Sequence, residues 1–310
     1  MSLARNALLA LSTNRWLRER ATRTAFVRRS VSSFMPGERL EDAMAAAAVQ
    51  QRAGVGTILT KLGENLTAID EAENVTRHYL DVLDAVGARQ LRAEISVKPT
   101  QLGLDLDAEL CYSNLQRLVE HAAARDNFIW IDMESSPYVD PTLDLFRRTR
   151  ARSPRIGLAL QAYLHRTPQD VESLVPLGSA IRLVKGAYLE AASVALPKKA
   201  DVDESFYRLA CRLLAEDARN AGGRLHIATH DPKLVERISR FIEERGVPPS
   251  AYEYAMLYGI QRPLQQRLSA AGRPLRVLIA YGEYWFPWYM RRLAERPANV
   301  GFVIRNIFAR

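Results

Sequence analysis

Two adjacent arginines near the C-terminus, Arg291 and Arg292, are the residues of this chain best suited to chemistry, and Glu295 follows one helical turn later. The aromatic run WFPWY at residues 285–289 indicates that the helix carrying them is mostly covered. A covered guanidinium needs an anion, and its planar fork matches a carboxylate or a phosphate. Taken alone, the pair fits an anion-binding site and a structural ion-pair network equally well.

A second group of polar residues stands at the ends of short apolar segments. These residues are Lys98, Asp132, Glu134, Gln161, Lys185, Thr229 and His230. If the segments are parallel strands of one barrel, their carboxyl ends converge on one rim, where barrel enzymes have their active sites. Together with Arg182 and the arginine pair, this group predicts a cation-rich mouth that binds an anionic substrate, an anionic cofactor, or both. For each cation singly, a structural salt bridge is the simpler interpretation.

Several common catalytic arrangements are absent from the sequence. There is no GxSxG motif, and neither Cys111 nor Cys211 has a histidine nearby in the chain. His226 and His230 are four residues apart, which on a strand is about 13 Å, so they could not bind one metal ion together. The GxGxxG and GxxxxGK(S/T) motifs are missing as well. We therefore expect no metal and no Rossmann or Walker nucleotide site, while other nucleotide sites stay open.

Short apolar segments alternate with helical patterns from residue 54 onward. The expected strands are 55–60, 92–98, 128–134, 156–163, 181–186, 224–230, 252–258 and 276–281. The helical patterns include 41–51, 64–86, 107–125, 202–220, 232–245 and 261–270. Eight strands, each followed by a helix, predict an α/β fold of the (βα)8 barrel type. We expect a helical arm at 1–50 and the barrel at 51–310.

Side-chain alternation in three of these strands, 92–98, 128–134 and 224–230, also predicts a barrel. One face carries Ala93, Ile95, Val97, Ile129, Ile131, Met133, Leu225 and Ile227. The other carries Glu94, Ser96, Lys98, Phe128, Trp130, Asp132, Glu134, His226, Ala228 and His230. We expect the apolar face to pack on the outer helices and the second face to point into the barrel. An antiparallel sheet would alternate likewise, but it would not separate its strands by helices.

The charge of the chain is unevenly distributed. The net charge is +8, and residues 1–39 hold eight arginines against two acidic residues. We therefore expect basic amphipathic helices in the arm that meet an acidic partner, although residues 1–35 would also suit a transit peptide. The two isolated cysteines indicate a reducing compartment. No apolar run approaches the roughly 20 residues of a membrane span.

Several segments together resemble the proline dehydrogenase family. The signature segments are RLVKGAY (182–188), ATH (228–230), MLYGI (256–260), YG (281–282) and YMRRLAERPAN (289–299). Shorter matches are LGE (62–64), SVK (96–98), ID (131–132) and QAY (161–163). They occur in order over nearly the whole chain, so a chance match is improbable.

The resemblance implies a distorted (βα)8 barrel that binds FAD without a covalent bond. It also implies oxidation of L-proline to Δ1-pyrroline-5-carboxylate, with the electrons passed to a membrane quinone. Since little of the 310 residues remains for an aldehyde dehydrogenase domain, we expect a monofunctional enzyme. The expected location is the cytoplasm, with the arm as a candidate contact to the inner face of the membrane, and no nucleic acid partner is expected.

The same resemblance implies roles for the substrate residues. Lys98, Arg291 and Arg292 would clamp the substrate carboxylate, and Tyr188 would cover the substrate. Glu64 would pair with Arg291 across the mouth as a gate.

The expected catalytic residues are Asp132 and Arg182. Arg182 would lie beside flavin N5, where a fixed cation favours the reduced flavin. Asp132 would orient its cationic neighbours, and because lysine and arginine lower the pKa of a nearby carboxylate, it is not expected to be a strong base. The remaining residues expected at the cofactor are Met133, Gln161, Val184, Lys185, Gly186, Thr229, His230 and Glu295.

One pocket position departs from the family. Four residues before Gly282, family members commonly have a tyrosine that covers the proline ring, and this chain has Leu278. Leucine keeps an apolar contact but removes a hydroxyl, so 4-hydroxyproline or another cyclic imino acid stays open as the substrate. A further alternative is a catalytically silent barrel that serves as a binding module.

Overall fold

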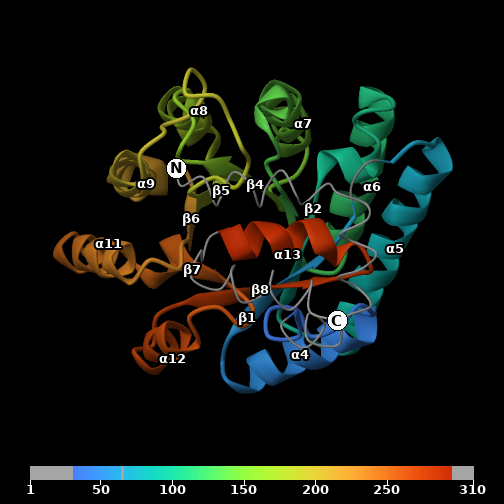
Figure 1. Ribbon diagram of the computed structural model, residues 1–310, viewed down its shortest axis with the longest axis horizontal. Coiled ribbons are helices and arrows are strands. Elements are labelled where there is room, and N and C mark those ends of the chain that lie inside the picture. The colour runs from blue at the N-terminus through green and yellow to red at the C-terminus, as the bar shows by residue number, and fades with distance from the viewer. Residues whose placement is uncertain (1–30, 64–65, 295–310) are drawn as a thin grey trace, which may run out of the picture.

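A closed barrel forms the centre of the protein. The computed structural model describes residues 31–63 and 66–294, with the backbone alone for 291–294. In this part of the chain, eight parallel strands close in the order β1 to β8 (Figure 1). They are β1 Gly56–Lys61, β2 Ala93–Val97, β3 Ile129–Ile131, β4 Ile156–Gln161, β5 Ala180–Val184, β6 Arg224–Ala228, β7 Tyr252–Leu257 and β8 Leu275–Tyr281. Each overlaps one predicted segment, so the (βα)8 barrel is confirmed.

Helices surround this barrel. The α-helices of the described residues are α4 Leu40–Arg52, α5 Ile69–Ala88, α6 Ala108–Ala123, α7 Val139–Arg150, α8 Thr167–Leu174, α9 Lys199–Leu213, α10 Glu216–Asn220, α11 Pro232–Glu244, α12 Arg262–Ala270 and α13 Trp285–Ala294. Short 3-10 turns are η1 Pro99–Leu102, η2 Ser136–Tyr138, η3 Val175–Leu177 and η4 Pro249–Ala251. Side-chain caps fix some helix starts: Asp107 accepts from the Leu110 amide at 2.7 Å, and Asp231 accepts from the Lys233 amide at 3.1 Å.

Three elements depart most clearly from their predicted bounds. β3 ends at Ile131, shorter than the predicted 128–134. The helix predicted at 64–86 is described from Ile69, because Ala68 is extended and Glu71 accepts hydrogen bonds from the Thr67 and Ala68 amides. The single helix predicted at 202–220 is two helices, α9 and α10, because Ala215 has an extended backbone that interrupts the helical hydrogen bonds.

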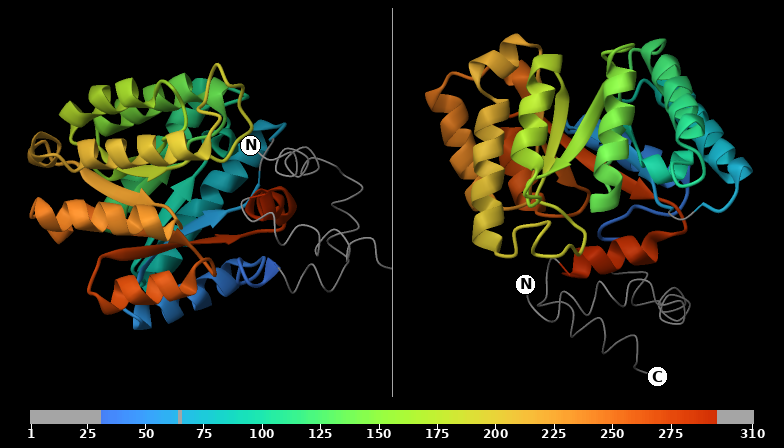
Figure 2. Two further views of the ribbon diagram at one scale, coloured as in Figure 1. Left: turned by 60° about the vertical axis from the view of Figure 1, so that its left-hand side comes forward. Right: turned by 90° about the horizontal axis from the view of Figure 1, so that it is seen from above.

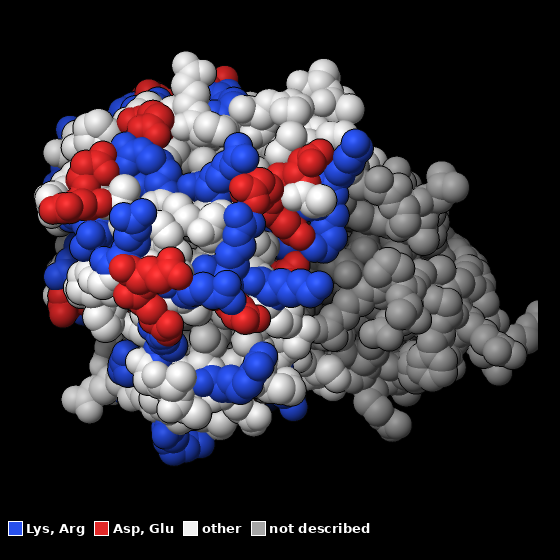
Figure 3. Space-filling model, turned by 90° about the vertical axis from the view of Figure 1, so that its left-hand side faces the viewer, with Lys and Arg blue, Asp and Glu red and all other residues white. Residues whose placement is uncertain are grey.

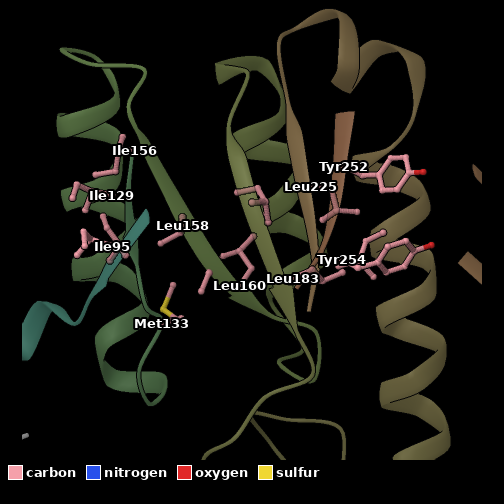
Figure 4. Close-up of a cluster of buried hydrophobic side chains, with 14 of the residues drawn as sticks. Ile95, Ile129, Met133, Ile156, Leu158, Leu160, Leu183, Leu225, Tyr252 and Tyr254 are labelled. Carbon is pink, nitrogen blue, oxygen red and sulfur yellow. The ribbon is translucent and has the colours of Figure 1, made fainter. Parts of the chain in front are cut away.

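The apolar faces of the strands meet the helices, as predicted. Side chains from β2 to β7 form one continuous core, part of which Figure 4 shows. Its labelled members are Ile95, Ile129, Met133, Ile156, Leu158, Leu160, Leu183, Leu225, Tyr252 and Tyr254. Burying these residues on the outside of the barrel leaves the alternate residues of each strand to fill its interior.

The interior of the barrel at the amino ends of the strands holds a buried charged network. The Trp130 indole donates to Glu94 at 2.6 Å, and Arg276 bridges Glu94 (3.3 Å) and Glu253 (2.9 Å). His226 Nε2 lies 2.8 Å from Glu253, and burial lowers the pKa of His226 to about 4. These side chains fill that half of the barrel, so a ligand has room only toward the carboxyl ends.

Helix α13 lies across the end of the barrel to which the strands point (Figure 2). Its first turns carry Trp285, Phe286 and Tyr289, which are all buried. At the wall of the barrel, α4 packs against β1 and β8. The expected boundary between arm and barrel, at residue 50, therefore falls inside a helix of the barrel wall.

Candidate active site

Four side chains meet at the carboxyl ends of β2, β3 and β5. The Lys98 ammonium lies 3.0 Å from Asp132 Oδ2, and Ser96 Oγ donates to Asp132 Oδ1 at 2.9 Å. Arg182 Nη2 donates to Ser96 Oγ at 2.8 Å and also contacts Asp132 Oδ1 directly. Two cations and one hydroxyl therefore hold a single carboxylate, as the alternation of β2 and β3 predicts.

Asp132 is ionised in this arrangement. Burial alone would raise its pKa, but the charges of Lys98 and Arg182, with hydrogen bonds from Lys98 and Ser96, lower it below the ordinary value. Burial also lowers the pKa of Arg182, although a guanidinium stays protonated in proteins. The group thus carries a net positive charge and suits an anion better than a proton transfer from substrate to Asp132.

Arg182 retains an unused donor. Its side chain is 3% exposed, and its Nη1 has no hydrogen-bond partner among the residues that the structure describes. The guanidinium carbon lies 5.3 Å from the centre of the Trp130 ring, which forms the floor beneath it. An unpaired buried donor is costly, so this atom fits an acceptor on a ligand.

A second charged cluster lies at the ends of β5 and β6. Lys185 Nζ lies 2.5 Å from Asp203 and 3.1 Å from Asp231, and Lys199 Nζ lies 3.0 Å from Asp231 and also contacts Asp203. Although burial would raise it, these lysines lower the pKa of Asp231 to about 2. Lys185 was predicted at the cofactor, whereas Lys199, Asp203 and Asp231 were missed. The DP pair at 231–232 is a helix-start signal that could have found Asp231.

The other predicted cofactor residues lie around these clusters. Gln161 Nε2 donates to the Glu134 carbonyl at 2.8 Å, and Thr229 Oγ1 accepts from the Asp231 amide at 3.2 Å. His230 Nε2 accepts from the Leu257 amide at 2.9 Å, which places its proton on Nδ1. These contacts hold the side chains at the rim.

Backbone geometry explains the glycine in the RLVKGAY segment. Gly186 has φ +117°, and a Cβ there would lie 2.2 Å from the Tyr163 ring. Val184 precedes it at the end of β5, and its carbonyl accepts from the Ala162 amide at 2.8 Å. The sharp turn after β5 therefore requires glycine, and it directs the chain toward the half-buried Tyr188.

Two predicted site residues, Met133 and Glu134, contact other parts of the protein than the remaining predicted site residues do. Met133 belongs to the helix-facing core, so the structure does not bring its side chain together with the polar group. Glu134 is 5% exposed and accepts from the Thr100 amide (3.1 Å) and hydroxyl (2.8 Å), which ties it to η1. We therefore assign Glu134 to holding the start of η1.

Leu278 points into the barrel, as predicted. It is half-buried and packs against the buried cluster of Ile58, Trp130 and Ala180. It lies in register with Leu257 on one side and Ile58 on the other. The inner surface beside Leu278 therefore includes this apolar cluster, and Trp130 in it is a residue to which the sequence analysis assigned no role.

Four predicted residues lack a described side chain. Glu64 and Glu295 lie outside the described residues. Arg291 and Arg292 lie in α13, of which the structure describes only the backbone at these positions. Their roles stay predictions.

Two general features of the described residues bear on the type of site. No group of three or more histidine, cysteine or acidic side chains in residues 31–63 and 66–294 is placed to hold a metal ion. Within the same residues, every helix is too short or too polar to cross a membrane.

The fold and the charged rim place this protein among (βα)8-barrel proteins with a site at the carboxyl ends of the strands. The chain belongs to the proline dehydrogenase family, because the family model described as Proline dehydrogenase matches residues 43–305. Proline dehydrogenase 1 of Bacillus subtilis (strain 168) is 34% identical over 305 residues, which are 98% of this chain and 99% of that protein. Proline dehydrogenase of Deinococcus radiodurans is 36% identical over 279 residues, 88% of each chain.

A solved structure supports the fold. The crystal structure of proline utilization A (PutA) from Bdellovibrio bacteriovorus inactivated by N-propargylglycine matches with a TM-score of 0.81 at 22% identity. The match covers 91% of this chain and 34% of that one, so this chain spans about a third of that protein. At this identity the likeness concerns the barrel.

Proposed function

We propose that this protein is an FAD-dependent proline dehydrogenase that oxidises L-proline to Δ1-pyrroline-5-carboxylate and passes the electrons to a membrane quinone. Membership of the family over residues 43–305 supports the activity. The observation that carries the proposal is the group of Lys98, Asp132, Ser96 and Arg182, which combines a net positive charge with a buried unused donor.

The residues present fit a bound flavin. Arg182 Nη1 is a buried donor without a protein acceptor among the described residues. Arg182 belongs to β5, which pairs with β4 and β6, and Gln161, Thr229 and His230 lie at the carboxyl ends of these two strands. We assign these four residues, with Val184, Lys185 and Gly186, to holding FAD. Bound FAD would supply the acceptor for the hydride removed from the substrate. The fixed charge of Arg182 would favour added electron density beside it.

Lys98 would bind the substrate carboxylate together with Arg291 and Arg292. Asp132 holds the Lys98 ammonium at 3.0 Å and so fixes its position before substrate arrives. Because the pKa of Asp132 is lowered, this carboxylate would remain ionised at neutral pH and orient the cations. Tyr188 and Leu278 would border the substrate ring.

Flavin reduction tests the proposal. The purified protein should be yellow, and the colour should bleach anaerobically with L-proline but not with alanine. N-propargylglycine, the compound that inactivated the Bdellovibrio protein, should inactivate this one in the same way. Yellow protein that proline leaves unbleached would favour another cyclic imino acid, and 4-hydroxyproline is then the first substrate to try. Protein unable to take up FAD would favour the binding module.

The electron acceptor is tested separately. Reduced protein should reoxidise with a soluble quinone analogue and not with NAD, because the described site has no feature of a nicotinamide pocket. Stoichiometric NADH from proline would refute the quinone assignment.

The arginine pair gives a further test. Arg291→Met and Arg292→Met should each lower kcat/KM and leave FAD bound, since each removes one guanidinium from the substrate carboxylate. The loss should correspond to about 2–4 kcal/mol of transition-state stabilisation. Arg208→Met, at an exposed arginine of α9, is the matched control. Near-normal kinetics in both variants would contradict the assignment of the pair.

A further inference from the structure

The segment Val31–Glu38, here called the strap, lies against α13. Val31 and Met35 are 4% and 3% exposed, so the strap is anchored by its own apolar residues. The Phe34 ring lies 6.4 Å from the Tyr289 ring, centre to centre. These contacts join the beginning of the described chain to its last helix.

One hydrogen bond joins the strap to the first residue of α13. The Trp285 indole donates to Glu38 Oε1 at 2.9 Å. Trp285 itself is 2% exposed, and its ring lies 6.1 Å from that of Tyr289 in the next turn. Glu38 therefore accepts from the one polar atom of the buried Trp285 ring. Its negative charge at the amino end of a helix also agrees with the helix dipole.

The other side of the strap is fixed by the loop after β7. Gly259 has φ +75°, and a Cβ there would lie 1.7 Å from the Ser33 carbonyl oxygen. The absence of a side chain at Gly259 therefore lets the strap approach the barrel. The strap is held between the barrel rim and α13.

We propose that the strap positions α13 over the mouth of the barrel, with Glu38 as its positioning residue. Arg291 lies six residues beyond Trp285, which is about 9 Å along the helix. The Glu38 contact therefore holds the start of α13 at a short distance from the arginine pair. A displacement of the groups that hold the substrate carboxylate weakens substrate binding, so it should raise KM more than it lowers kcat. The inference rests on the proposed function, because it assigns α13 to substrate binding.

Substitutions in the full-length FAD-bound protein test it. Glu38→Ala and Trp285→Phe each remove the hydrogen bond, and Phe keeps an aromatic ring. Each should raise KM for proline about three- to tenfold with kcat within about twofold, and the double variant should add little to either. Glu38→Gln keeps an acceptor oxygen and should restore most of the wild-type KM. Glu41→Ala removes the same charge from an exposed position of α4 and should have wild-type kinetics.

Hydrogen–deuterium exchange provides a readout that does not depend on turnover. Amides of residues 285–294 should exchange faster in Glu38→Ala than in wild type or Glu41→Ala, while those of α6 should not change. Unchanged exchange and unchanged KM in Glu38→Ala would overturn the role of the strap. If wild-type protein is not bleached by proline, the proposed function fails, and the exchange rates alone still decide whether the strap holds α13.

Discussion

At the scale of single residues, one hydroxyl joins two of the three charged side chains of the site, Asp132 and Arg182. Ser96 Oγ donates to Asp132 at 2.9 Å and accepts from Arg182 at 2.8 Å, and Ser96 is fully buried in the barrel. Its hydrogen bond is also one of the causes that lower the pKa of Asp132. Ser96 thus orients Asp132 and Arg182 and also helps to keep Asp132 ionised.

Ser96→Ala should lower kcat/KM for proline about tenfold, because a hydrogen bond to a charged group contributes roughly 1.5–3 kcal/mol and the direct Asp132–Arg182 contact remains. The variant should also raise the pKa of Asp132, so that activity is lost at a higher pH on acidification. Because the pKa of Asp132 lies below its ordinary value, profiles of kcat/KM that extend from about pH 3 to pH 9 measure both effects. Ser179→Ala, at a buried serine whose hydroxyl donates to the Leu174 carbonyl, is the control and should leave the profile unmoved. If the pH profile of Ser96→Ala is lowered but has the same shape as that of wild type, Ser96 has no role in the protonation of Asp132.

Leu278 offers a second residue-scale prediction. If leucine in place of the usual family tyrosine loosens the pocket, Leu278→Tyr should shift preference toward proline over 4-hydroxyproline by roughly ten- to a hundredfold, about 1–3 kcal/mol. Leu278 packs against the buried cluster that contains Trp130, so a tyrosine ring here must fit beside that cluster. Leu278→Met conserves the apolar volume and should keep the wild-type ratio of the two kcat/KM values. The same ratio in wild type and Leu278→Tyr would end this explanation.

Residue positions were predictable from sequence where strand alternation decides them. Alternation alone places Lys98, Asp132 and Ser96 inside the barrel, and the structure shows them in contact. It could not predict that Lys199 and Asp203 meet Lys185, because both come from α9. Where a helix lies on the rim depends on the length and path of the loop before it, which no local pattern records.

At the scale of elements, the strands were the most readable part of the sequence. Buried parallel strands are near-continuous apolar runs bounded by polar residues, so each of the eight was found to within a few residues. The division into α9 and α10 was not predicted, because one extended alanine breaks the pattern without glycine or proline. Ion pairs across the barrel, such as that of Glu94 with Arg276, depend on strand register and could not be predicted from the sequence either.

The buried network at the amino ends of the strands predicts a pH dependence of stability. The ordinary histidine pKa is 6.5, and burial lowers that of His226 to about 4. Between these values the unfolded chain binds a proton that the folded protein does not, so the free energy of unfolding should fall as the pH falls, by up to about 1.4 kcal/mol per pH unit. Above about pH 6.5 this contribution should be constant.

Urea unfolding of wild type and His226→Gln at pH 7.0, 5.5 and 4.5 measures this effect. The variant should have a lower stability overall but a smaller loss between pH 7.0 and 4.5. His165→Gln removes an exposed histidine and should keep the wild-type slope. If the free energy of unfolding falls equally with pH in all three proteins, His226 does not stay neutral in the folded state.

At the scale of the whole molecule, the described body carries interleaved charges. Figure 3 shows basic and acidic side chains alternating over the face that includes α9 and α11. Ion pairs there join neighbouring elements, such as Arg212 with Glu172 at 2.7 Å and Arg237 with Glu204 at 2.7 Å. Exposed pairs of this kind contribute little to stability. Because their signs are mixed, this face has no large patch of a single charge. The concentration of arginine before residue 40 is therefore the distinctive charge of the chain.

That arginine-rich stretch predicts attachment to an anionic membrane, which would bring the barrel to the membrane quinone proposed as its electron acceptor. Near such a surface each cation contributes about 1 kcal/mol, and the attraction should weaken with salt. Co-sedimentation with anionic vesicles should therefore retain the full-length protein at low salt and release it at high salt. A chain that begins at residue 30 keeps the strap and should stay unbound, as should full-length protein in which Arg18, Arg20, Arg23, Arg28 and Arg29 are changed to Gln. Equal binding by all three proteins, or by none, would exclude the arm as the membrane contact.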